Sequence, residues 1–374
     1  MTEASHLKTI EQIATDVVAQ HAVSVDKNAE FPTQSMAALA EAGLLGLVSA
    51  TSVGGMGLGM RAAADVVERL ARECGSTAMV TAMHYAAVQV IEQHGPEDVR
   101  KQIAAGKHLT TLAFSELGSR SQFWAPVSVA VADGKSVKLT ARKSWVTSAH
   151  AAQSYVWSSK PLAAAEASTI WLVPADTKGL RVTERFDGMG LCGNDSAPIT
   201  AEDARIDAKN MLGSDGAGFK LMLEVVLPWF NLLNAACSLG LMEAATARTA
   251  LHATATGFEH SGSRVADLPT VRAYLARMRV KTDAVRGLLL DTLDALEKGR
   301  PDAVLRVLEI KAFAGETATE VTDLGMRVAG GAAFRKEVGV ERVFRDARAA
   351  SVMAPTTDVL YDFIGKAVCN LPLF

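Results

Sequence analysis

Two short stretches of the chain combine hydroxyl, amide and aromatic groups in a pattern suited to holding a flat ring. The first is residues 114–122, FSELGSRSQ, and the second is residues 143–148, KSWVTS, which close an alternating segment. A planar ring with polar edges needs N–H groups and hydroxyls along its edge and an aromatic wall beside it. A Gly/Ser loop beside a Trp-x-Thr strand can supply both, so we predict a flavin-binding platform within residues 109–149. The same residue types would also suit an ordinary turn and a core tryptophan.

The composition is that of a globular protein without a charged macromolecular partner. The chain has 374 residues, which suits two or three domains, and 49% of them are hydrophobic against 21% charged. The net charge of −3 gives no reason to expect nucleic acid or an anionic membrane as a partner. The four cysteines are scattered without a C-x-x-C pair, and the N-terminus does not read as a signal peptide. We therefore expect free thiols and a cytoplasmic protein.

Three further features have plain interpretations. Residues 225–242 are mostly apolar, but Pro228, Asn231 and Asn234 interrupt them and no basic cluster flanks them, so we expect a buried helix rather than a membrane span. The eight histidines show no ligand spacing, and we expect no metal site. The basic residues of the segment 335–348 are interleaved with acidic ones, which favours a solvated or ion-paired helix face over an anion site.

The order of the expected elements divides the chain into three domains and predicts an α+β fold. Apolar residues at helical spacing predict a helical domain over residues 1–107. Short β-branched or alternating segments predict a compact antiparallel sheet or barrel over 108–214, and long apolar stripes predict a helical bundle over 215–374. The glycine string GMGLCG at 188–193 has the spacing of a dinucleotide fingerprint. The sequence NDSAPIT that follows it cannot begin a phosphate-binding helix, so we interpret the string as a turn.

Four strings together resemble those of the acyl-CoA dehydrogenase family, over nearly the whole chain. They are SELGSRS at 115–121, KSWVT at 143–147, LGSDGAGF at 212–219, and GG at 330–331 followed by RDAR at 345–348. The resemblance implies an N-terminal helical domain, a middle β-barrel domain and a C-terminal four-helix bundle. It also implies FAD held between the middle domain and the bundle, a CoA-thioester substrate, and a homo-oligomer, either a dimer or a tetramer.

The resemblance assigns roles by position. Ser115 matches a residue at the pyrimidine edge of the flavin, and Ser121 matches a serine near the phosphate or thioester end. Trp145 matches the aromatic neighbour of the ring, and Thr147 matches the hydroxyl near flavin N5, which we count as catalytic as well. The family's arginine at the FAD pyrophosphate, which acts across a subunit boundary, is absent from FEHSG at 258–262, leaving Arg264 or His260 to replace it. The remaining expected FAD contacts are Phe114, Gly330, Gly331 and Thr356.

The main departure from the family's pattern is that its catalytic base is missing from the usual positions. In the family a Glu removes the α-proton of the thioester while hydride leaves the β-carbon for flavin N5. Ala354 stands at the commoner place for this Glu, and PWFN at 228–231 stands at the alternative one, with Asn231 in place of an Arg. Candidate replacements are Asp358, Glu116 and Glu224, which would need a raised pKa. His84 is a further active-site candidate, although its helix suits a hydrogen-bonded core histidine better.

Three hypotheses follow from these departures. The first is an FAD-dependent oxidoreductase acting on an acyl-CoA or a CoA-linked ring acid, in an oxygen-using, monooxygenase-like reaction such as that of the tropone-type branch of the family. The second is ordinary α,β-dehydrogenation with a relocated base. The third is an inactive partner subunit, against which the retained residues Ser115, Ser121, Trp145 and Thr147 argue. We favour the first slightly over the second.

Overall fold

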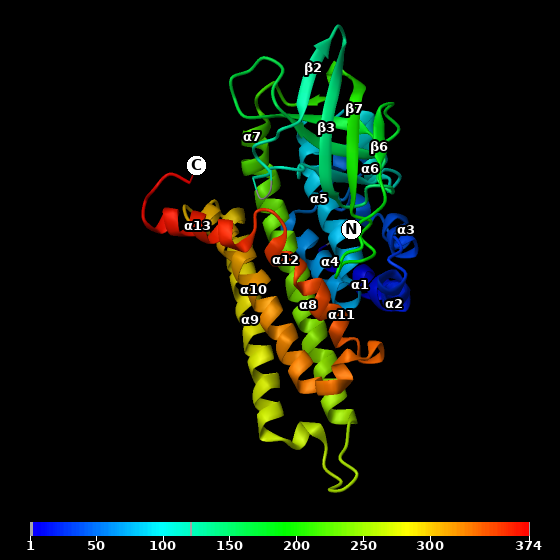
Figure 1. Cartoon of the computed structure of the whole chain (residues 1–374), viewed down its shortest axis with the longest axis vertical. Helices are drawn as coiled ribbons and strands as arrows, with labels where there is room; N and C mark the ends of the chain where they lie inside the picture. Colours follow the sequence, from blue (N-terminus) through cyan, green and yellow to red (C-terminus); the bar gives the residue numbers. More distant parts are fainter. Residues whose placement is uncertain (1–2, 120–121, 374) are drawn as a thin grey trace.

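The chain folds into a helical part, a two-sheet part and a bundle of long helices, in that order along the sequence (Figure 1). The computed structural model describes residues 3–119 and 122–373. Gly43 follows α3 with a φ of 73°, a left-handed conformation that favours glycine and ends the helix. The elements of the first part are α1 (Glu3–Ile13), η1 (Ala14–Val18), α2 (Ala19–Lys27), α3 (Thr33–Glu41), η2 (Leu44–Gly46), η3 (Thr51–Val53), α4 (Met60–Glu73), α5 (Gly75–His94) and α6 (Glu97–Ala104).

Two four-stranded sheets make up the middle part. Their orders are β1-β4-β5-β8 and β2-β3-β7-β6, and every pairing is antiparallel except the parallel pair β1–β4. Side chains of both sheets, including Trp157 and Trp171 from one and Leu139 and Ile199 from the other, share one buried core. The strands are β1 (Thr110–Ala113), β2 (Val129–Asp133), β3 (Ser136–Val146), β4 (Ser154–Ser159), β5 (Thr169–Pro174), β6 (Leu180–Val182), β7 (Ala197–Asp207) and β8 (Met211–Leu212), with a helical turn η4 (Ala208–Asn210) before β8.

The long strand β7 was not expected from the sequence. Its buried positions are Ala197, Ile199, Ala201, Ala204 and Ile206, so small residues fill most of its inward face. Alanine has little strand preference, and the alternation shifts by one residue at 202–203, where Asp203 has a φ of 48°. The pattern was therefore too weak to indicate a strand, although β7 pairs with both β3 and β6.

The C-terminal part is a bundle in which α8, α9 and α10 run side by side (Figure 1). The continuous helical segment Gly218–Ala255, which contains α8, is long and apolar enough to cross a membrane, but 78% of its most apolar 18-residue window is buried inside the protein. It is a core helix, as the sequence predicted. The elements are α7 (Gly218–Leu221), η5 (Met222–Val226), α8 (Leu227–Ala255), η6 (Val265–Asp267), α9 (Pro269–Glu297), α10 (Ala303–Ala329), η7 (Gly330–Phe334), η8 (Lys336–Val338), α11 (Val340–Ala347), α12 (Ala349–Val352) and α13 (Thr357–Val368).

The first part and the bundle share one hydrophobic core. Helices α4 and α8 cross so closely that a Cβ on Gly240 would lie 2.3 Å from the carbonyl oxygen of Glu68. Glu68 and Glu243 both accept hydrogen bonds from Arg286, so ion pairs link α4, α8 and α9 beside this crossing. The N-terminal helices and the C-terminal bundle therefore pack together as one unit.

Candidate active site

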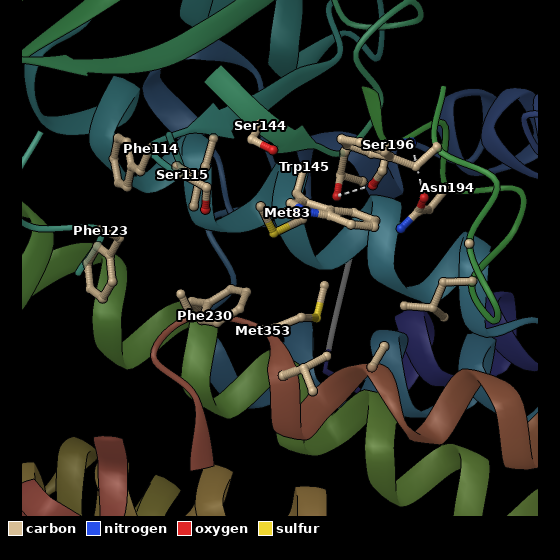
Figure 2. Close-up of a pocket in the computed structure, with 18 of the residues that line it drawn as sticks. Met83, Phe114, Ser115, Phe123, Ser144, Trp145, Asn194, Ser196, Phe230 and Met353 are labelled. Atoms are coloured by element: carbon tan, nitrogen blue, oxygen red, sulfur yellow. Dashed lines mark hydrogen bonds between the residues drawn. The ribbon is translucent and has the colours of Figure 1, made fainter. Parts of the chain in front are cut away.

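A cavity of about 860 Å³ lies where the middle part meets the helices (Figure 2). Its walls are formed by α5, the ends of β1 and β3, the loop 186–196, the beginning of α8 and the segment 349–354. Among the described lining residues, the uncharged oxygen-bearing side chains all come from the middle part: Ser115, Ser144, Thr147, Asn194 and Ser196. The helices and the residues after α12 contribute apolar side chains: Met83, Val226, Leu227, Phe230, Ala349, Val352, Met353 and Ala354. One side of the cavity can bind polar edges, and the other can take an apolar group.

Trp145 forms an aromatic part of the polar side. Its ring stacks on that of Phe186 at 3.9 Å between centroids and 22° between planes, and it remains 59% exposed. The residue has a φ of 54°, which is costly for a bulky side chain and persists only where the surroundings hold it. The N–H of Ser144 donates to the carbonyl of Ser115 at 2.9 Å, which fastens the end of β3 to the loop after β1. The two stretches singled out in the sequence thus meet at the cavity.

Thr147 is buried in the same wall. Its Oγ1 lies 3.5 Å from the hydroxyl oxygen of Ser196, and the N–H of the next residue, Ser148, donates to the carbonyl of Asn194 at 2.9 Å. Ser148 and Asp195 also have positive φ values, 57° and 55°. Such backbone conformations cost free energy and persist only where surrounding contacts hold them in place. They are found mainly at functional sites.

The loop 186–196 forms a wall that sequence reasoning missed. A Cβ on Gly190 would lie 2.3 Å from the carbonyl oxygen of Arg345, so glycine is needed for this close approach. The N–H of Leu191 donates to the carboxylate of Asp346 at 2.6 Å, and burial raises the pKa of Asp346 to about 6. The glycine string is a loop and not a nucleotide fingerprint, as predicted, but Gly190 marks tight packing against α11 and Gly193 marks tight packing against Val25 and Glu30.

In the basic segment before and along α11, Lys336 and Arg345 are ion-paired, in agreement with the expectation of a solvated or ion-paired helix face. Arg345 forms salt bridges with Asp26 on α2 and with Glu341, both at 2.6 Å. It also donates to the carbonyl of Met189 at 2.9 Å. The segment therefore fastens the cavity loop to the N-terminal helices.

The carboxylate of Glu116 is fully engaged, which corrects its assignment as a relocated base. It accepts hydrogen bonds from the N–H groups of Val127 and Ser128 at 2.5 and 3.0 Å, from the hydroxyl of Ser128, and from the ammonium of Lys143 at 2.5 Å. Burial raises the pKa of Glu116, but the charge of Lys143 and these hydrogen bonds outweigh it and hold the pKa below the usual value. Glu116 fixes the loop after β1 and does not offer a basic oxygen to a substrate.

The other two carboxylate candidates lie outside the cavity. Asp358 is exposed in the first turn of α13 and borders a separate surface groove with Asp362 and Lys366. Glu224 is exposed and lies 3.9 Å from the ammonium of Lys220. Ala354 does line the cavity, beside Met353. Neither carboxylate reaches the site. Spacing along the chain could not show this, because it depends on how the helices pack.

His84 is a core residue, which corrects its assignment to the active site. The side chain is fully buried, and its Nδ1 accepts the N–H of Thr110 at 3.2 Å while Nε2 lies 3.1 Å from the carbonyl oxygen of Leu45. Both ring nitrogens are used if Nε2 carries the proton. Burial lowers the pKa of His84 to about 4. The imidazole is a neutral link between α5, β1 and η2.

The expected FAD contacts fall into two groups. Phe114 and Ser115 line the cavity together with Trp145 and Thr147. Arg264, Gly330 and Gly331 lie in segments at the end of the bundle remote from the sheets (Figure 1). Thr356 precedes α13 and does not line the cavity, and Ser121 lies outside the described residues.

The described cavity fits a flavin ring. Trp145 and Met83 offer flat or polarisable apolar surface, and Ser115 and Ser144 lie on the same side of the cavity as Trp145 (Figure 2). Thr147 lines the cavity as well, so the wall carries the hydroxyls that a ring with polar edges requires. Among residues 3–119 and 122–373, no group of three or more His, Cys, Asp or Glu side chains could hold a metal ion.

Comparison with known proteins defines the class. Three family models match the chain in sequence: the acyl-CoA dehydrogenase N-terminal domain at residues 2–106, the middle domain at 111–204 and the C-terminal domain at 216–369. The protein is therefore a flavin oxidoreductase with FAD as its cofactor. It belongs to the acyl-CoA dehydrogenase family.

Individual relatives are similar over almost the whole chain. Probable acyl-CoA dehydrogenase YngJ of Bacillus subtilis is 28% identical, over 94% of this chain and 93% of the relative. Cyclohex-1-ene-1-carbonyl-CoA dehydrogenase of Geobacter metallireducens is 26% identical, over 97% and 96%. The solved structure of the prolyl acyl carrier protein oxidase AnaB has a TM-score of 0.89 at 19% identity, covering 98% of each chain, and it shows likeness of fold alone.

Proposed function

We propose that this protein uses FAD and molecular oxygen to oxidise an acyl-CoA or a CoA-linked ring acid, in a reaction that does not begin with the family's usual carboxylate base. One observation carries the proposal. Among the described residues that line the cavity, Glu116 is the only charged one, and its oxygens are taken by Lys143, Ser128 and Val127. Ala354 occupies the wall at the place that the family resemblance gives to the base, and a methyl group cannot accept a proton.

The chain's own residues support binding of both the cofactor and an apolar acyl group. Trp145 would cover one face of the flavin ring, while Ser115 and Thr147 would bind its polar edge. FAD, when bound, supplies the two-electron chemistry. Met83, Phe230 and Met353 would enclose the acyl group and exclude water from it.

An oxygen-using reaction removes the need for an α-proton base. In hydroxylation of a ring, one oxygen atom of O₂ enters the substrate and the other leaves as water, with two electrons taken from a reduced nicotinamide or flavin donor. The oxidase named among the similar structures supports the idea that this fold accommodates oxygen as an electron acceptor. A cyclic acyl group is supported by the relative named for a cyclohexene carbonyl thioester.

Ordinary dehydrogenation is the second candidate. The family membership favours it, because the relatives matched in sequence are named as dehydrogenases. It would require a base that no described cavity residue offers, or one from another copy of the chain. A catalytically inactive subunit is disfavoured by the retained polar side of the cavity.

We also propose a homo-oligomer, dimer or tetramer. Arg264, Gly330 and Gly331 are too remote from the cavity to contact the same FAD, so they would serve the cofactor of a neighbouring copy (Figure 1). A cytoplasmic location remains a prediction, with which four unpaired cysteines agree.

The experiment is an anaerobic titration of the purified protein with straight-chain, alicyclic and aromatic acyl-CoAs, followed by visible absorption. Flavin that stays oxidised with every thioester supports the proposal, and the chemically reduced enzyme is then mixed with thioester and isotopically labelled O₂. Label in the acyl product is the expected result. Flavin that bleaches rapidly without oxygen would favour dehydrogenation, and a colourless protein that binds no added FAD would favour the inactive subunit.

A further inference from the structure

Lys311 is a buried cation beneath the wall of the cavity. It lies in the middle of α10, and its side chain is fully buried. Its Nζ donates to the carbonyl oxygens of Ala350, Met353 and Pro355 at 3.1, 3.0 and 2.7 Å. These three carbonyls belong to residues 350–355, which comprise the end of α12 and the residues that lead from it towards α13, and which we call the turn 350–355.

The turn 350–355 forms part of the cavity wall. Val352, Met353 and Ala354 line the cavity, and the Lys311 ammonium also lies 5.7 Å from the ring centroid of Phe230, another lining residue. Figure 2 shows Phe230 and Met353 next to each other, on the side of the cavity that faces Trp145. Lys311 is thus one layer behind the position where the family resemblance puts a base.

The number of donors matches the number of acceptors only when Lys311 is charged. An ammonium group has three N–H bonds, one for each carbonyl. A neutral amine has two N–H bonds and a lone pair, so one buried carbonyl would lose its donor and face the lone pair. An unsatisfied buried acceptor is costly, and the turn would have to move to recover a partner.

We propose that Lys311 is a positioning residue for this cavity: its ammonium group holds the turn 350–355 so that Met353 and Ala354 close the wall, and loss of its proton releases the turn. The proposal rests on the assignment of the cavity as the reaction site of the proposed function. Its test reads the turn directly and needs no substrate.

The electrostatic surroundings allow the proton to leave near neutral pH. Burial alone lowers the pKa of Lys311 to about 7, without a carboxylate to restore it. The titratable and charged side chains on the elements packed against it are exposed or partly exposed, and none of the following forms an ion pair with Lys311: Glu309 and Glu316 on α10, Asp358, Tyr361, Asp362 and Lys366 on α13, and Arg348 before α12. Helix α8 carries no charged residue from Leu227 to Met242. A group with a pKa near 7 is roughly nine-tenths charged at pH 6 and about one-hundredth charged at pH 9.

Hydrogen–deuterium exchange of the FAD-loaded protein tests the proposal. The N–H of Met353 donates to the carbonyl of Ala349 at 3.0 Å, so peptides covering 349–357 report on the turn. After correction for intrinsic exchange rates, we expect protection in the wild type to fall by on the order of tenfold from pH 6 to pH 9, with a midpoint near 7. The far half of α10, residues 318–325, should keep its protection.

Three variants separate charge from shape. Lys311→Met removes the donors and should show low protection of the turn at both pH values. Lys311→Arg keeps a charge that cannot be lost in this range and should show high protection at both. Lys281→Met, at a half-exposed ion pair on α9, is the matched control and should behave as the wild type.

Two results would overturn the proposal: protection of the wild-type turn that is constant from pH 6 to pH 9, or wild-type protection in Lys311→Met. If neither Lys311 variant folds, the pH series of the wild type decides alone. Rapid anaerobic bleaching by an acyl-CoA, found together with a pH-dependent turn, would refute the proposed function and leave the role of Lys311 standing, so the two failures are distinguishable.

Discussion

Restoring a carboxylate at position 354 is the sharpest perturbation of the cavity. Ala354→Glu would place a carboxylate beside Met353 in a wall that is otherwise apolar, and the cavity of about 860 Å³ has room for the longer side chain. The apolar wall disfavours the charged form and raises the pKa of the new group towards the range of an effective general base, while the Lys311 ammonium behind the turn limits this rise. A positioned base contributes about 10² to 10⁴ to the rate of proton abstraction.

The expected result is anaerobic bleaching of the flavin by an acyl-CoA at least about 100-fold faster than in the wild type. Stopped-flow absorbance of the oxidised flavin measures it, and the rate should increase with pH through the raised pKa. Ala354→Gln is the matched control, since it has the same shape without a basic oxygen, and it should stay slow.

Equal rates in the Glu and Gln variants would refute the reasoning, provided that both bind FAD and are reduced normally by dithionite. The same holds if the wild type already bleaches as fast as Ala354→Glu. In that case a base reaches the substrate from outside the described lining of one chain.

Other expectations follow from single side chains. Thr147→Val removes a hydroxyl from the wall and should weaken FAD binding about fivefold to tenfold. Thr147→Ser keeps the hydroxyl and should bind FAD as the wild type does, and equilibrium dialysis of the apoprotein measures both affinities. The pKa of His84 is about 4 in the fold and about 6.5 when unfolded, so the unfolded chain binds more protons in this interval. The free energy of unfolding should therefore fall by on the order of 3 kcal/mol from pH 7 to pH 4 on its account. Urea titrations of the wild type and His84→Phe isolate this slope, because other groups such as Asp346 titrate in both, and parallel curves would contradict it. Glu116→Gln leaves the Lys143 ammonium buried without its counter-charge and should cost about 3 to 5 kcal/mol in the same assay; a loss below about 1 kcal/mol would mean that the pair is not buried as described.

Local patterns in the sequence predicted much of the fold. The helical bundle expected over 215–374 is present and ends in α13 (Thr357–Val368), because apolar residues recur at helical spacing there. The order of helices, sheet and helices was also predicted, because apolar residues recur with a period of 3.6 in helices and of 2 in strands. The strand β7 escaped because its inward side chains are mostly alanine.

The sequence by itself also determined which side chains could form a flavin platform, since Ser115, Trp145 and Thr147 carry the necessary chemistry in two short stretches. Tertiary structure decided which polar groups are available there. Glu116 pairs with Lys143, 27 residues away, and the ring nitrogens of His84 contact Thr110 and Leu45, 26 and 39 residues away. Hydrogen-bond partners at such separations are set by how elements pack, and no local periodicity encodes them.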